Sequence, residues 1–411
     1  MSAIKDASLY PSGLKKIDWV RANMPAITLI ERRFKKERPL EGIKIALSVH
    51  LEAKTANLAI VLREGGAEVR AAGCNPLSTQ DDVAAALDHL GFEVFSWRGE
   101  SEADYEKNLL STLEFCPDII IDDGGDLSEL LHGQYGQYAQ NLIGGCEETT
   151  TGVLRLRART NEGRLNFPMV AVNDAICKNH FDNRYGTGQS VWDAIMHTTN
   201  LMVTGKYVVV AGYGYCGRGI AMRAKGLGAV VVVTEIDPHK ALEAYMDGYL
   251  VMPMEKAALL GDIFVTSTGC EKVIRREHME QMKNGAILSN AGHFDVEIDK
   301  DALKALAEKI ETRRDDIEGY YLRDGRVLNL LAEGRLVNLA AGNGHPAEIM
   351  DMSFSIQALC VEYIAKYGKE LEPGVYDVPP EIDREVAFMK LAAQGLEIDY
   401  LSEEQKSYLG I

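Results

Sequence analysis

Short apolar segments alternate with amphipathic helical stretches in two successive runs, and this alternation constrains the fold most. The first run begins at "IKIALSV" (43–49) and includes "DIIIDDGGD" (118–126). The second extends from "GKYVVVAGYG" (205–214) to "RLVNLAAG" (335–342). Because strands that alternate with helices form parallel sheets covered on both faces, the pattern predicts an α/β fold. We expect two doubly wound, Rossmann-like domains.

The length of the chain and a change of pattern near its end predict how the domains divide. A chain of 411 residues is long enough for at least two domains. From about Pro346 the pattern becomes helical, and after Pro373 it indicates an appended helix and arm. We assign a substrate-binding domain to residues 1–182, completed by about 346–380, a nucleotide-binding domain to 183–345 and a C-terminal helical arm to 381–411.

Charge, cysteine content and hydropathy exclude several classes of protein. The formal net charge of −17, from 44 Lys and Arg against 61 Asp and Glu, argues against nucleic acid or anionic membrane as a partner. The seven cysteines are scattered and form no C-x-x-C pair, which indicates reduced thiols rather than disulfides or a zinc framework, so we expect no metal site. The stretch "MSAIKDASLYPSGLKKIDWV" has no apolar core of the kind found in signal peptides, and no apolar run approaches about 18 residues. We therefore expect a cytoplasmic protein with a small-molecule ligand.

The segment "VVVAGYGYCGRG" (208–219) carries a dinucleotide-binding pattern. Gly212, Gly214 and Gly217 have G-x-G-x-x-G spacing between an apolar strand and a helix. Glycines at this spacing allow a tight turn and close approach of the backbone to a pyrophosphate, which the helix N-terminus favours. The next strand ends at Glu235, whose carboxylate can accept both ribose hydroxyls but would repel a 2′-phosphate. We therefore expect NAD rather than NADP as the cofactor.

Polar side chains follow many of the expected strands at their carboxyl ends, where ligands bind in open α/β sheets. Two polar loops, "CEETTTG" (146–152) and "CKNHFDNRYGTG" (177–188), lie between the two runs. Each polar residue alone could simply cap a helix, but together they predict one cleft for a polyhydroxylated substrate. The strand-end residues are His50, Asp123 and Asn173 in the first run and Thr268, His293 and Asn338 in the second.

Lys178 and Asp182 are four residues apart, and this spacing has two interpretations. The two side chains can form an ordinary ion pair along a helix. Alternatively, a lysine held near a carboxylate can assist the oxidation of a sugar hydroxyl. From its residues alone, the chain is interpreted as an NAD-dependent enzyme that acts on a polyhydroxylated substrate between two domains.

Several long motifs are similar to those of one family over about residues 14–410. They are "NPLSTQDDVAAAL", "DDGGDL", "EETTTGV", "FDNRYGTG", "NAGHFDVEID", "LLAEGRLVNLA" and "GHP". In this order they resemble the S-adenosyl-L-homocysteine hydrolases. The resemblance implies an NAD-dependent hydrolase of a thioether bond, with a nucleoside-homocysteine substrate, a homotetrameric assembly and one NAD bound tightly by each protomer.

Two other classes of protein are weighed against this resemblance. An ordinary NAD-dependent dehydrogenase would accumulate NADH, and nothing in that class explains "EETTTG" or "FDNRYGTG". A non-catalytic nucleotide sensor should have lost Lys178, Asp182 or His293, yet all three are present.

The resemblance implies a redox cycle that nets to hydrolysis. A hydride leaves the ribose C3′, and the resulting 3′-ketone acidifies the C4′ hydrogen. A base can then remove that proton, and homocysteine departs from C5′. Water adds to the enone, and the hydride returns to C3′. Ordinary acid–base groups, each worth about 10²–10⁴-fold, suffice once the ketone has formed.

The same resemblance implies roles for individual substrate-side residues. Lys178 and Asp182 act at the 3′-hydroxyl, with Lys178 as the proton acceptor. Asp123, His50 and His293 form the acid–base group around C4′ and C5′. The expected substrate-binding residues are Glu148 and Thr149 at the ribose hydroxyls and His345 at the substrate and hinge.

Cofactor contacts and hinges are implied in the same way. The hinges are expected near 183–187 and 343–346, so that the domains close on substrate and exclude water. Besides the three glycines, the expected cofactor-binding residues are Asn183, Glu235, Thr268 and Asn338, with Thr149, Thr150 and Thr151 toward the nicotinamide.

Two departures from the family pattern concern the cofactor. Thr187 stands where many members have a cysteine near the nicotinamide, so a thiol at this position is not essential here. The sequence ends at "SYLGI", whereas many members continue into a tail that reaches the NAD of a neighbouring protomer. Cofactor binding is therefore expected to depend less on the partner.

A third departure concerns the purine. Many members carry His-x-Thr-x-Glu, in which Thr and Glu contact the adenine edge, whereas this chain has His50-x-Glu52-x-Lys54. Adenine offers an N1 acceptor and an N6 donor, and hypoxanthine offers the reverse. Two hypotheses therefore stay open. Glu52 and Lys54 bind hypoxanthine, so that S-inosyl-L-homocysteine is accepted or preferred, or they pair with each other while backbone groups bind adenine.

Overall fold

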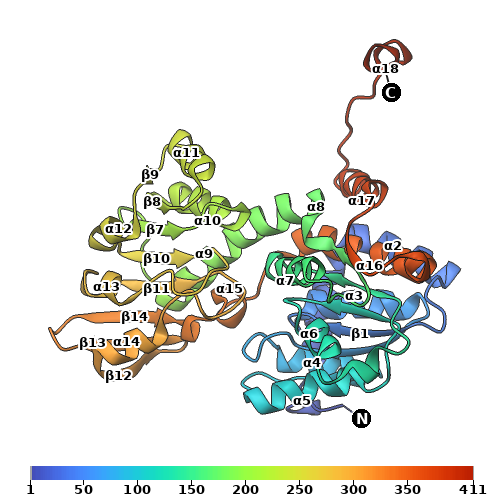
Figure 1. Ribbon diagram of the computed structural model, residues 1–411, viewed down its shortest axis with the longest axis horizontal. Helices are drawn as coiled ribbons and strands as arrows, with labels where there is room; N and C mark the ends of the chain where they lie inside the picture. The colour runs from blue at the N-terminus through green and yellow to red at the C-terminus, as the bar shows by residue number, and fades with distance from the viewer. Residues whose placement is uncertain (1, 411) are drawn as a thin grey trace.

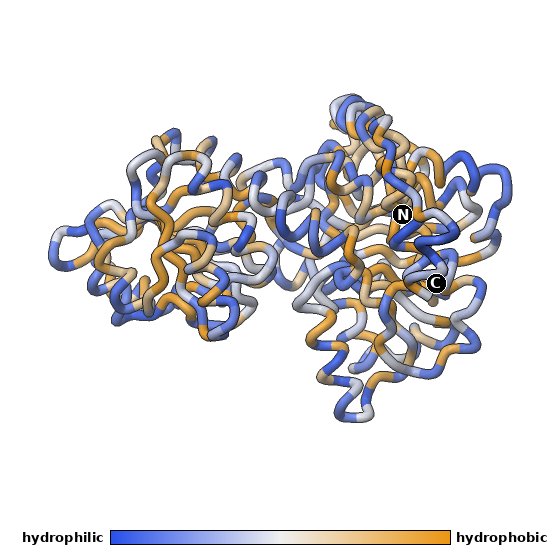
Figure 2. Tube along the Cα trace, turned by 90° about the horizontal axis from the view of Figure 1, so that it is seen from above, coloured by the Kyte–Doolittle hydropathy of each residue, from blue (hydrophilic) through white to orange (hydrophobic). Residues whose placement is uncertain are grey.

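The chain forms two lobes, each built on its own central sheet, in the computed structural model, which describes residues 2–410 (Figure 1). The apolar strands lie at the centre of each lobe and are enclosed by more hydrophilic segments (Figure 2). This confirms the α/β fold with two Rossmann-like units and a C-terminal helical segment. The exact domain bounds stay a prediction.

The first lobe contains a parallel sheet of seven strands. Their order is β15-β6-β5-β4-β1-β2-β3, so the direction in which strands are added reverses between β4 and β1. In sheets of this type, ligands bind beyond the carboxyl ends of the strands at such a reversal. The strands are β1 (Lys44–Ser48), β2 (Glu68–Ala72), β3 (Glu93–Phe95), β4 (Ile119–Asp122), β5 (Gly144–Glu147), β6 (Pro168–Ala171) and β15 (Gly374–Asp377).

Helices cover both faces of this sheet. The α3 helix is buried at every residue from 53 to 62, because it lies between the sheet and the helices α2 and α16. The helices of this lobe are α1 (Tyr10–Ala22), α2 (Pro25–Glu37), α3 (Ala53–Glu64), α4 (Asp81–His89), α5 (Glu102–Leu113), α6 (Asp126–His132), α7 (Thr150–Asn161), α16 (Ala347–Tyr367) and α17 (Pro380–Ala393).

The second lobe contains a sheet of eight strands in the order β12-β13-β14-β11-β10-β7-β8-β9. The six strands from β14 to β9 are parallel, whereas β12 and β13 form an antiparallel hairpin at one edge that the sequence pattern did not predict. The strands are β7 (Tyr207–Ala211), β8 (Val230–Thr234), β9 (Leu250–Val251), β10 (Ile263–Thr266), β11 (Ile287–Asn290), β12 (Ala307–Arg314), β13 (Ile317–Leu322) and β14 (Val327–Leu331).

A long helical connection joins the two lobes. It consists of α8 (Ile176–Lys178), a π-helical segment η4 (Asn179–Gly186) and α9 (Thr187–Thr199). The chain returns to the first lobe after the short helix α15 (Val337–Ala340). The remaining helices of the second lobe are α10 (Tyr215–Gly226), α11 (Pro238–Met246), α12 (Met254–Leu260), α13 (Arg276–Met279) and α14 (Lys300–Leu306).

Both sheets have an apolar core on each face, because successive strand residues point to opposite sides. In β1, Ile45 and Leu47 belong to one core cluster and Ala46 belongs to the cluster on the other face. In β7, Val208 and Val209 divide in the same way. No helix within residues 2–410 combines the length and apolar character needed to cross a membrane.

Candidate active site

The loop after β7 has the geometry of a dinucleotide-binding turn. Gly212 has a φ of +94°, and a Cβ added there would lie 2.8 Å from the carbonyl oxygen of Ser267. A Cβ on Gly217 would lie 2.0 Å from the Gly212 carbonyl oxygen, so this position must also be glycine. A Cβ on Gly214 would meet no protein atom within 4 Å. The fold therefore requires two of the glycines, and the third leaves open space for a ligand at the start of α10.

Glu235 follows β8, at the edge of the sheet where the glycine loop lies. Its carboxylate accepts hydrogen bonds of 2.7 Å from the backbone N–H groups of Tyr213 and Ile236. These contacts hold Glu235 against the glycine loop, as expected of a carboxylate that binds the adenosine ribose.

Asn338 in α15 has a buried polar atom without a partner. Its Nδ2 donates to Ser190 Oγ over 3.1 Å, while its Oδ1 has no hydrogen-bond partner within residues 2–410. A buried acceptor left unpaired is costly, so a donor from a bound ligand fits this position. An amide group such as the nicotinamide carboxamide has that donor, and the residues present therefore fit NAD.

Thr268, two residues beyond β10, has both its hydroxyl and its backbone N–H bound to a carboxylate of the protein. Its hydroxyl donates to Glu297 Oε2 over 2.7 Å, and its backbone N–H also donates to the same carboxylate. Glu297 is buried and was missed by the sequence interpretation. Burial raises the pKa of Glu297, and the carboxylate acts as an anchor for the loop after β10.

Lys178, at the end of α8, lies in a buried group of polar side chains. Its Nζ donates to Asn183 Oδ1 over 2.7 Å and lies 3.6 Å from Asp182 Oδ2 and 3.7 Å from Glu148 Oε1. Burial lowers the pKa of Lys178, but the attraction of Asp182 and Glu148 outweighs it and raises the pKa. The structure therefore brings together the predicted pair at the 3′-hydroxyl.

Asp182 links the interdomain connection to the segment that returns from the second lobe. It accepts a 2.7 Å hydrogen bond from Ser353 Oγ, and His345 Nδ1 lies 2.5 Å from its Oδ1. Burial raises the pKa of Asp182, but Lys178 and His345 outweigh this effect and lower the pKa. Asp182 is thus a carboxylate at neutral pH, held between Lys178 and His345.

Glu148 lies just beyond β5 and accepts a hydrogen bond from Gln357 Nε2. Burial raises its pKa to about 8, although Lys178 opposes the shift. The preceding residue, Glu147, was missed in the sequence because it lies in a segment interpreted as a loop. Glu147 Oε1 accepts hydrogen bonds from the backbone N–H groups of Gly124 and Thr149, so it organises the loops after β4 and β5.

The three threonines that were predicted to contact the cofactor differ in their hydrogen-bond partners. Thr149 caps α7 by accepting from the Gly152 N–H, and its hydroxyl donates to Glu147. Thr150 Oγ1 donates to Asn173 Oδ1 over 3.2 Å. Thr151 makes no side-chain hydrogen bond within residues 2–410. Their predicted contacts with the cofactor stay a prediction.

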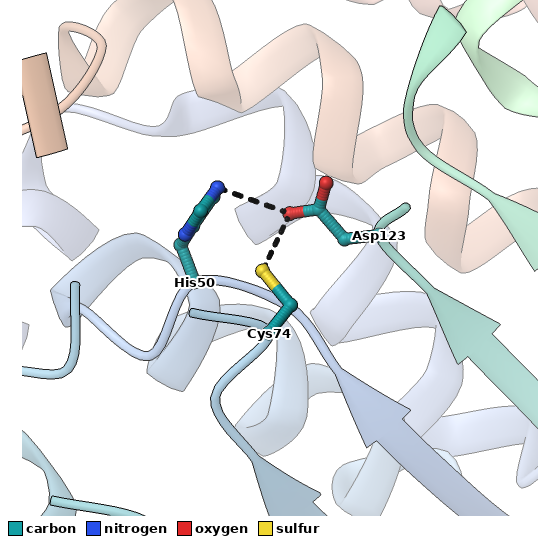
Figure 3. Close-up of side chains that lie close together, drawn as sticks. All are labelled: His50, Cys74 and Asp123. Carbon is teal, nitrogen blue, oxygen red and sulfur yellow. Dashed lines mark hydrogen bonds and ion pairs between the residues drawn. The ribbon is translucent and has the colours of Figure 1, made fainter. Parts of the chain in front are cut away.

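His50 and Asp123 lie beyond the carboxyl ends of β1 and β4, which are neighbours in the sheet. His50 Nε2 is 3.7 Å from Asp123 Oδ2, and His50 Nδ1 lies 2.8 Å from Ser78 Oγ. Burial lowers the pKa of His50 to about 4, despite the opposing charge of Asp123. Cys74, which sequence reasoning missed, donates its thiol to Asp123 Oδ2 over 3.4 Å (Figure 3).

His293 comes from the second lobe and completes this group. Its Nδ1 lies 3.9 Å from Asp123 Oδ1, and its ring centroid is 6.0 Å from that of His50. A Cβ on Gly124 would lie 2.2 Å from His293 Nε2, and Gly124 has a φ of +113°. The glycine therefore lets the histidine of one lobe approach the strand ends of the other.

Glu52 and Lys54 form a buried ion pair of 2.8 Å at the start of α3. Lys54 Nζ also donates to the Asn343 carbonyl oxygen over 2.9 Å, at the predicted second hinge. Glu52 Oε2 accepts from the backbone N–H of Lys54, and Glu52 Oε1 has no hydrogen bond within residues 2–410. The pairing considered from the sequence is present, and it leaves one carboxylate oxygen free.

Thr187, the residue that departs from the family pattern, lies beside a thiol from another element. Its hydroxyl is 3.7 Å from Cys216 Sγ in α10 and 3.2 Å from His345 Nε2. Thr187 therefore links α9, part of the helical connection between the lobes, to the segment that carries His345.

The residues around Lys178 and those around Asp123 thus form one polar centre between the lobes. Other predicted site residues lie at the carboxyl edge of the second sheet. The centre contains Lys178, Asp182 and Glu148 together with the histidine–aspartate group, whereas Glu235 and Thr268 contact none of these side chains within residues 2–410. This fold and site define a two-lobed, NAD-dependent enzyme with a buried acid–base centre.

Comparisons with known proteins specify the family. The family model described as S-adenosyl-L-homocysteine hydrolase matches residues 1–135, and the model of the NAD binding domain of the same family matches residues 183–344. The chain belongs to the S-adenosyl-L-homocysteine hydrolase family, and NAD is its cofactor.

Individual relatives cover nearly the whole chain. The S-inosyl-L-homocysteine hydrolase of Methanocaldococcus jannaschii is 57% identical and aligns with 100% of this chain and 98% of its own length. The adenosylhomocysteinase of Aquifex aeolicus is 58% identical over 99% of this chain and 97% of its own length. Among solved structures, a dipicolinate synthase from Bacillus halodurans shares the fold, with a TM-score of 0.50 and 12% identity over 80% of this chain and 99% of that chain.

Proposed function

We propose that this enzyme hydrolyses the thioether of a nucleosyl-homocysteine and prefers S-inosyl-L-homocysteine over S-adenosyl-L-homocysteine. The reaction type is that of the family, and the base preference rests on one observation, the buried Glu52–Lys54 pair beside Asn343. Relatives named for the inosyl and the adenosyl substrate are almost equally similar to this chain, so overall identity favours neither base.

The oxidation half of the proposed reaction depends on Lys178 and Asp182. When bound, NAD supplies a hydride acceptor for the C3′ hydrogen and a positive charge on its nicotinamide ring. Lys178 takes up the 3′-hydroxyl proton at Nζ, which requires the neutral amine, and a positive charge nearby would lower the pKa of Nζ and so favour that form before oxidation. Asp182 and Glu148 lie 3.6 Å and 3.7 Å from Nζ, so they hold the lysine side chain and stabilise its ammonium once the proton has been transferred.

The elimination half depends on the acid–base group at the strand ends of the first lobe. With its pKa near 4, His50 is neutral at physiological pH and can accept a proton. His293 lies 3.9 Å from the other carboxylate oxygen of Asp123, and its ring centroid is 6.0 Å from that of His50, so one substrate carbon can face both histidines. We propose that this group removes the C4′ proton and protonates the leaving thiolate at C5′.

The preference for hypoxanthine follows from which group stands at each purine position. In the family pattern, position 52 faces N1 and position 54 faces the substituent at C6. Glu52 accepts a hydrogen bond from the N1–H of hypoxanthine through its free Oε1, and Lys54 donates its remaining N–H to O6. With adenine, the carboxylate would face the N1 lone pair and the ammonium would face an amino group. Mismatched buried hydrogen-bonding groups can change kcat/KM by about 10⁴–10⁵-fold.

The experiment compares kcat/KM for the two thioethers on the purified holoenzyme, measured as homocysteine thiol release. We expect the inosyl substrate to be preferred by at least about 100-fold, which corresponds to a single mispaired polar contact. The double variant Glu52→Thr with Lys54→Glu introduces the Thr and Glu of the His-x-Thr-x-Glu pattern. It should shift the ratio of the two kcat/KM values toward the adenosyl substrate. A preference of the unmodified enzyme for the adenosyl substrate would overturn the proposed base.

A matched control separates base recognition from general damage to the site. Arg21 and Glu31 also form a 2.8 Å pair in the first lobe, between α1 and α2. Exchanging these two residues should leave the ratio of kcat/KM values unchanged, although it can change stability. An equal shift in both double variants would mean that the ratio reports on the fold of the lobe rather than on the base.

We also propose a homotetramer as the working assembly. The support is the family to which the chain belongs and the exposed apolar side chains of the C-terminal segment. These include Leu396, Tyr400 and Tyr408, which are 57%, 81% and 91% exposed in the isolated chain.

A further inference from the structure

Arg155 in α7 extends from the first lobe toward the loop of the second lobe that carries His293. Its Nη1 donates a 2.7 Å hydrogen bond to the carbonyl oxygen of Gly124, the residue after Asp123. The guanidinium carbon also lies 5.8 Å from the ring centroid of Phe294. Phe294 follows His293 directly, and the two rings pack edge to face. The positive charge of Arg155 therefore lies beside the residues assigned to proton transfer at C4′ and C5′.

One edge of the Arg155 guanidinium makes no hydrogen bond to the protein. Nη1 bonds to the Gly124 carbonyl and to Asp126 Oδ1, the latter over 3.0 Å. Nη2 lies 3.6 Å from Glu129 Oε2, and neither Nη2 nor Nε donates a hydrogen bond in the described part of the chain. An ordinary ion pair needs only the contact with Asp126. The free edge of Nε and Nη2 has the geometry that binds a carboxylate through two parallel hydrogen bonds.

The charges around Arg155 balance one another, and this balance selects the class of ligand. Asp126 and Glu129 in α6 face Arg155, and Glu129 also pairs with Arg159. The two acidic and two basic side chains have no net charge. A simple anion would add an unbalanced negative charge there, whereas an amino-acid zwitterion adds one charge of each sign. The group is therefore better suited to an amino acid than to a phosphate or a fatty acid.

A nucleosyl-homocysteine carries such a zwitterion close to its sulfur. Two methylene groups and the α-carbon separate the sulfur from the carboxylate. A Cβ on Gly124 would lie 2.2 Å from His293 Nε2, and the Gly124 carbonyl accepts from Arg155, so a single residue separates the two side chains. With C5′ at the histidine–aspartate group, the methylene groups can pack on the Phe294 ring and the carboxylate can reach the free edge of Arg155.

We propose that Arg155 binds the α-carboxylate of the homocysteinyl group through Nε and Nη2 and so selects amino-acid thioethers. This inference rests on the proposed function, because it takes a nucleosyl-homocysteine as the substrate. Arg155 gains and loses no proton in the reaction. It holds the leaving group so that the sulfur stays near His293 while the bond to C5′ breaks.

The test compares two thioethers of the same nucleoside on the full-length holoenzyme. One is the homocysteinyl compound, and the other is the 3-aminopropyl compound, which lacks only the carboxylate. Because both carry the same base, the ratio of their kcat/KM values, measured as thiol release, does not depend on base preference. The unmodified enzyme should prefer the homocysteinyl compound by about 10–100-fold, the range for hydrogen bonds to charged groups. A ratio near one would overturn the proposal.

Arg155→Met should remove this preference by lowering kcat/KM for the homocysteinyl compound alone. Arg155→Lys keeps the charge without the planar fork and should give an intermediate ratio. Since Nη1 also holds the Gly124 carbonyl, damage to the fold of the site would lower both kcat/KM values together. An equal loss on both thioethers would mean that Arg155 has only a structural role.

Arg157→Met is the matched control. Arg157 lies on the same helix, is half exposed and pairs with Asp174 over 2.7 Å. The ratio of kcat/KM values should not change in this variant. A change as large as that in Arg155→Met would show that the ratio reports on the charge of α7 and would contradict a specific carboxylate contact.

A binding measurement separates this inference from the proposed function. Calorimetry on Lys178→Met holoenzyme, in which oxidation of the substrate is expected to be blocked, gives the dissociation constants of both thioethers without turnover. The homocysteinyl compound should bind more tightly, and adding Arg155→Met should remove the difference. Equal dissociation constants would overturn the carboxylate site. Tighter binding of the homocysteinyl compound by an enzyme that hydrolyses neither thioether would contradict the proposed function and support the carboxylate site.

Discussion

Lys178 lies in a small buried volume that also contains the acidic side chains of Asp182 and Glu148, and its protonation depends on both. Asp182 stays ionised because Lys178 and His345 lower its pKa. Glu148 has its pKa raised to about 8 by burial. The ordinary helical ion pair considered from the sequence is thus part of a larger buried charge cluster. In such a cluster, removal of the ammonium affects the chemistry as well as the packing.

At the residue scale we predict that Lys178→Met blocks the first half-reaction. Without Nζ, no group accepts the 3′-hydroxyl proton, so reduction of the bound cofactor should slow by about 10²–10⁴-fold. The measurement is stopped-flow absorbance of enzyme-bound NADH after mixing with the nucleoside product. Unchanged formation of NADH would show that another residue accepts the proton.

Lys390→Met is the control for this prediction. Lys390 pairs with the buried Asp351 over 2.9 Å between α16 and α17, away from the polar centre. Both variants break a buried lysine–aspartate pair, so both should lower the melting temperature. Only Lys178→Met should slow formation of bound NADH.

At the scale of elements, the π-helical segment η4 packs against α10, the helix that follows the glycine loop. A Cβ on Gly219 would lie 1.8 Å from the Arg184 carbonyl oxygen, and one on Gly188 would lie 2.6 Å from the Gly219 carbonyl oxygen. The backbones of α9, η4 and α10 are therefore in direct contact. This contact connects the cofactor loop to the segment that carries Lys178 and Asp182.

We predict that Gly219→Ala destabilises the enzyme and weakens NAD binding together. The added methyl group must push α10 from η4, and overpacking of this kind costs about 1–3 kcal/mol. Gly226→Ala, at the end of the same helix, is the control, because a Cβ there meets nothing within 4 Å. The measurements are denaturant unfolding and NAD retained after gel filtration. Equal effects of the two substitutions would contradict this account of the packing.

At the scale of the whole molecule, the C-terminal segment leaves the first lobe after α17 and extends away from it to α18 (Glu403–Leu409) (Figure 1). Residues 394–410 are all exposed, and α18 has no buried residue. Such a segment adds nothing to the core of its own chain. Its apolar side chains are therefore available to a second copy of the chain, as the proposed tetramer requires.

We predict that removal of residues 395–411 lowers the oligomeric mass and leaves the lobes folded. Light scattering after gel filtration measures the mass, and far-ultraviolet circular dichroism checks the fold. Met202→Ser is the control, since it removes a 71% exposed apolar side chain outside the arm. A truncated enzyme with the mass of the full chain would show that other surfaces hold the assembly.

Several elements could not be predicted because their reasons lie elsewhere in the chain. Strand β5 contains Gly144 and Gly145, which have low strand propensity, and a Cβ on Gly145 would lie 2.5 Å from Ile120 Cγ1. Close packing by the neighbouring strand selects glycine there, and no local pattern reveals it. Strand β15 exists because it pairs with β6, some 200 residues earlier in the chain.

By itself, the sequence determined the two α/β units, the glycine loop with Glu235, and the family, because these depend on local periodicity and on motifs of short span. Only the tertiary structure decided which polar residues meet. His293 approaches Asp123 from the other lobe, Cys74 joins His50 across adjacent strands, and Lys54 reaches the Asn343 carbonyl. Such contacts depend on strand order and on the approach of the two lobes, and spacing along a chain carries no information about either.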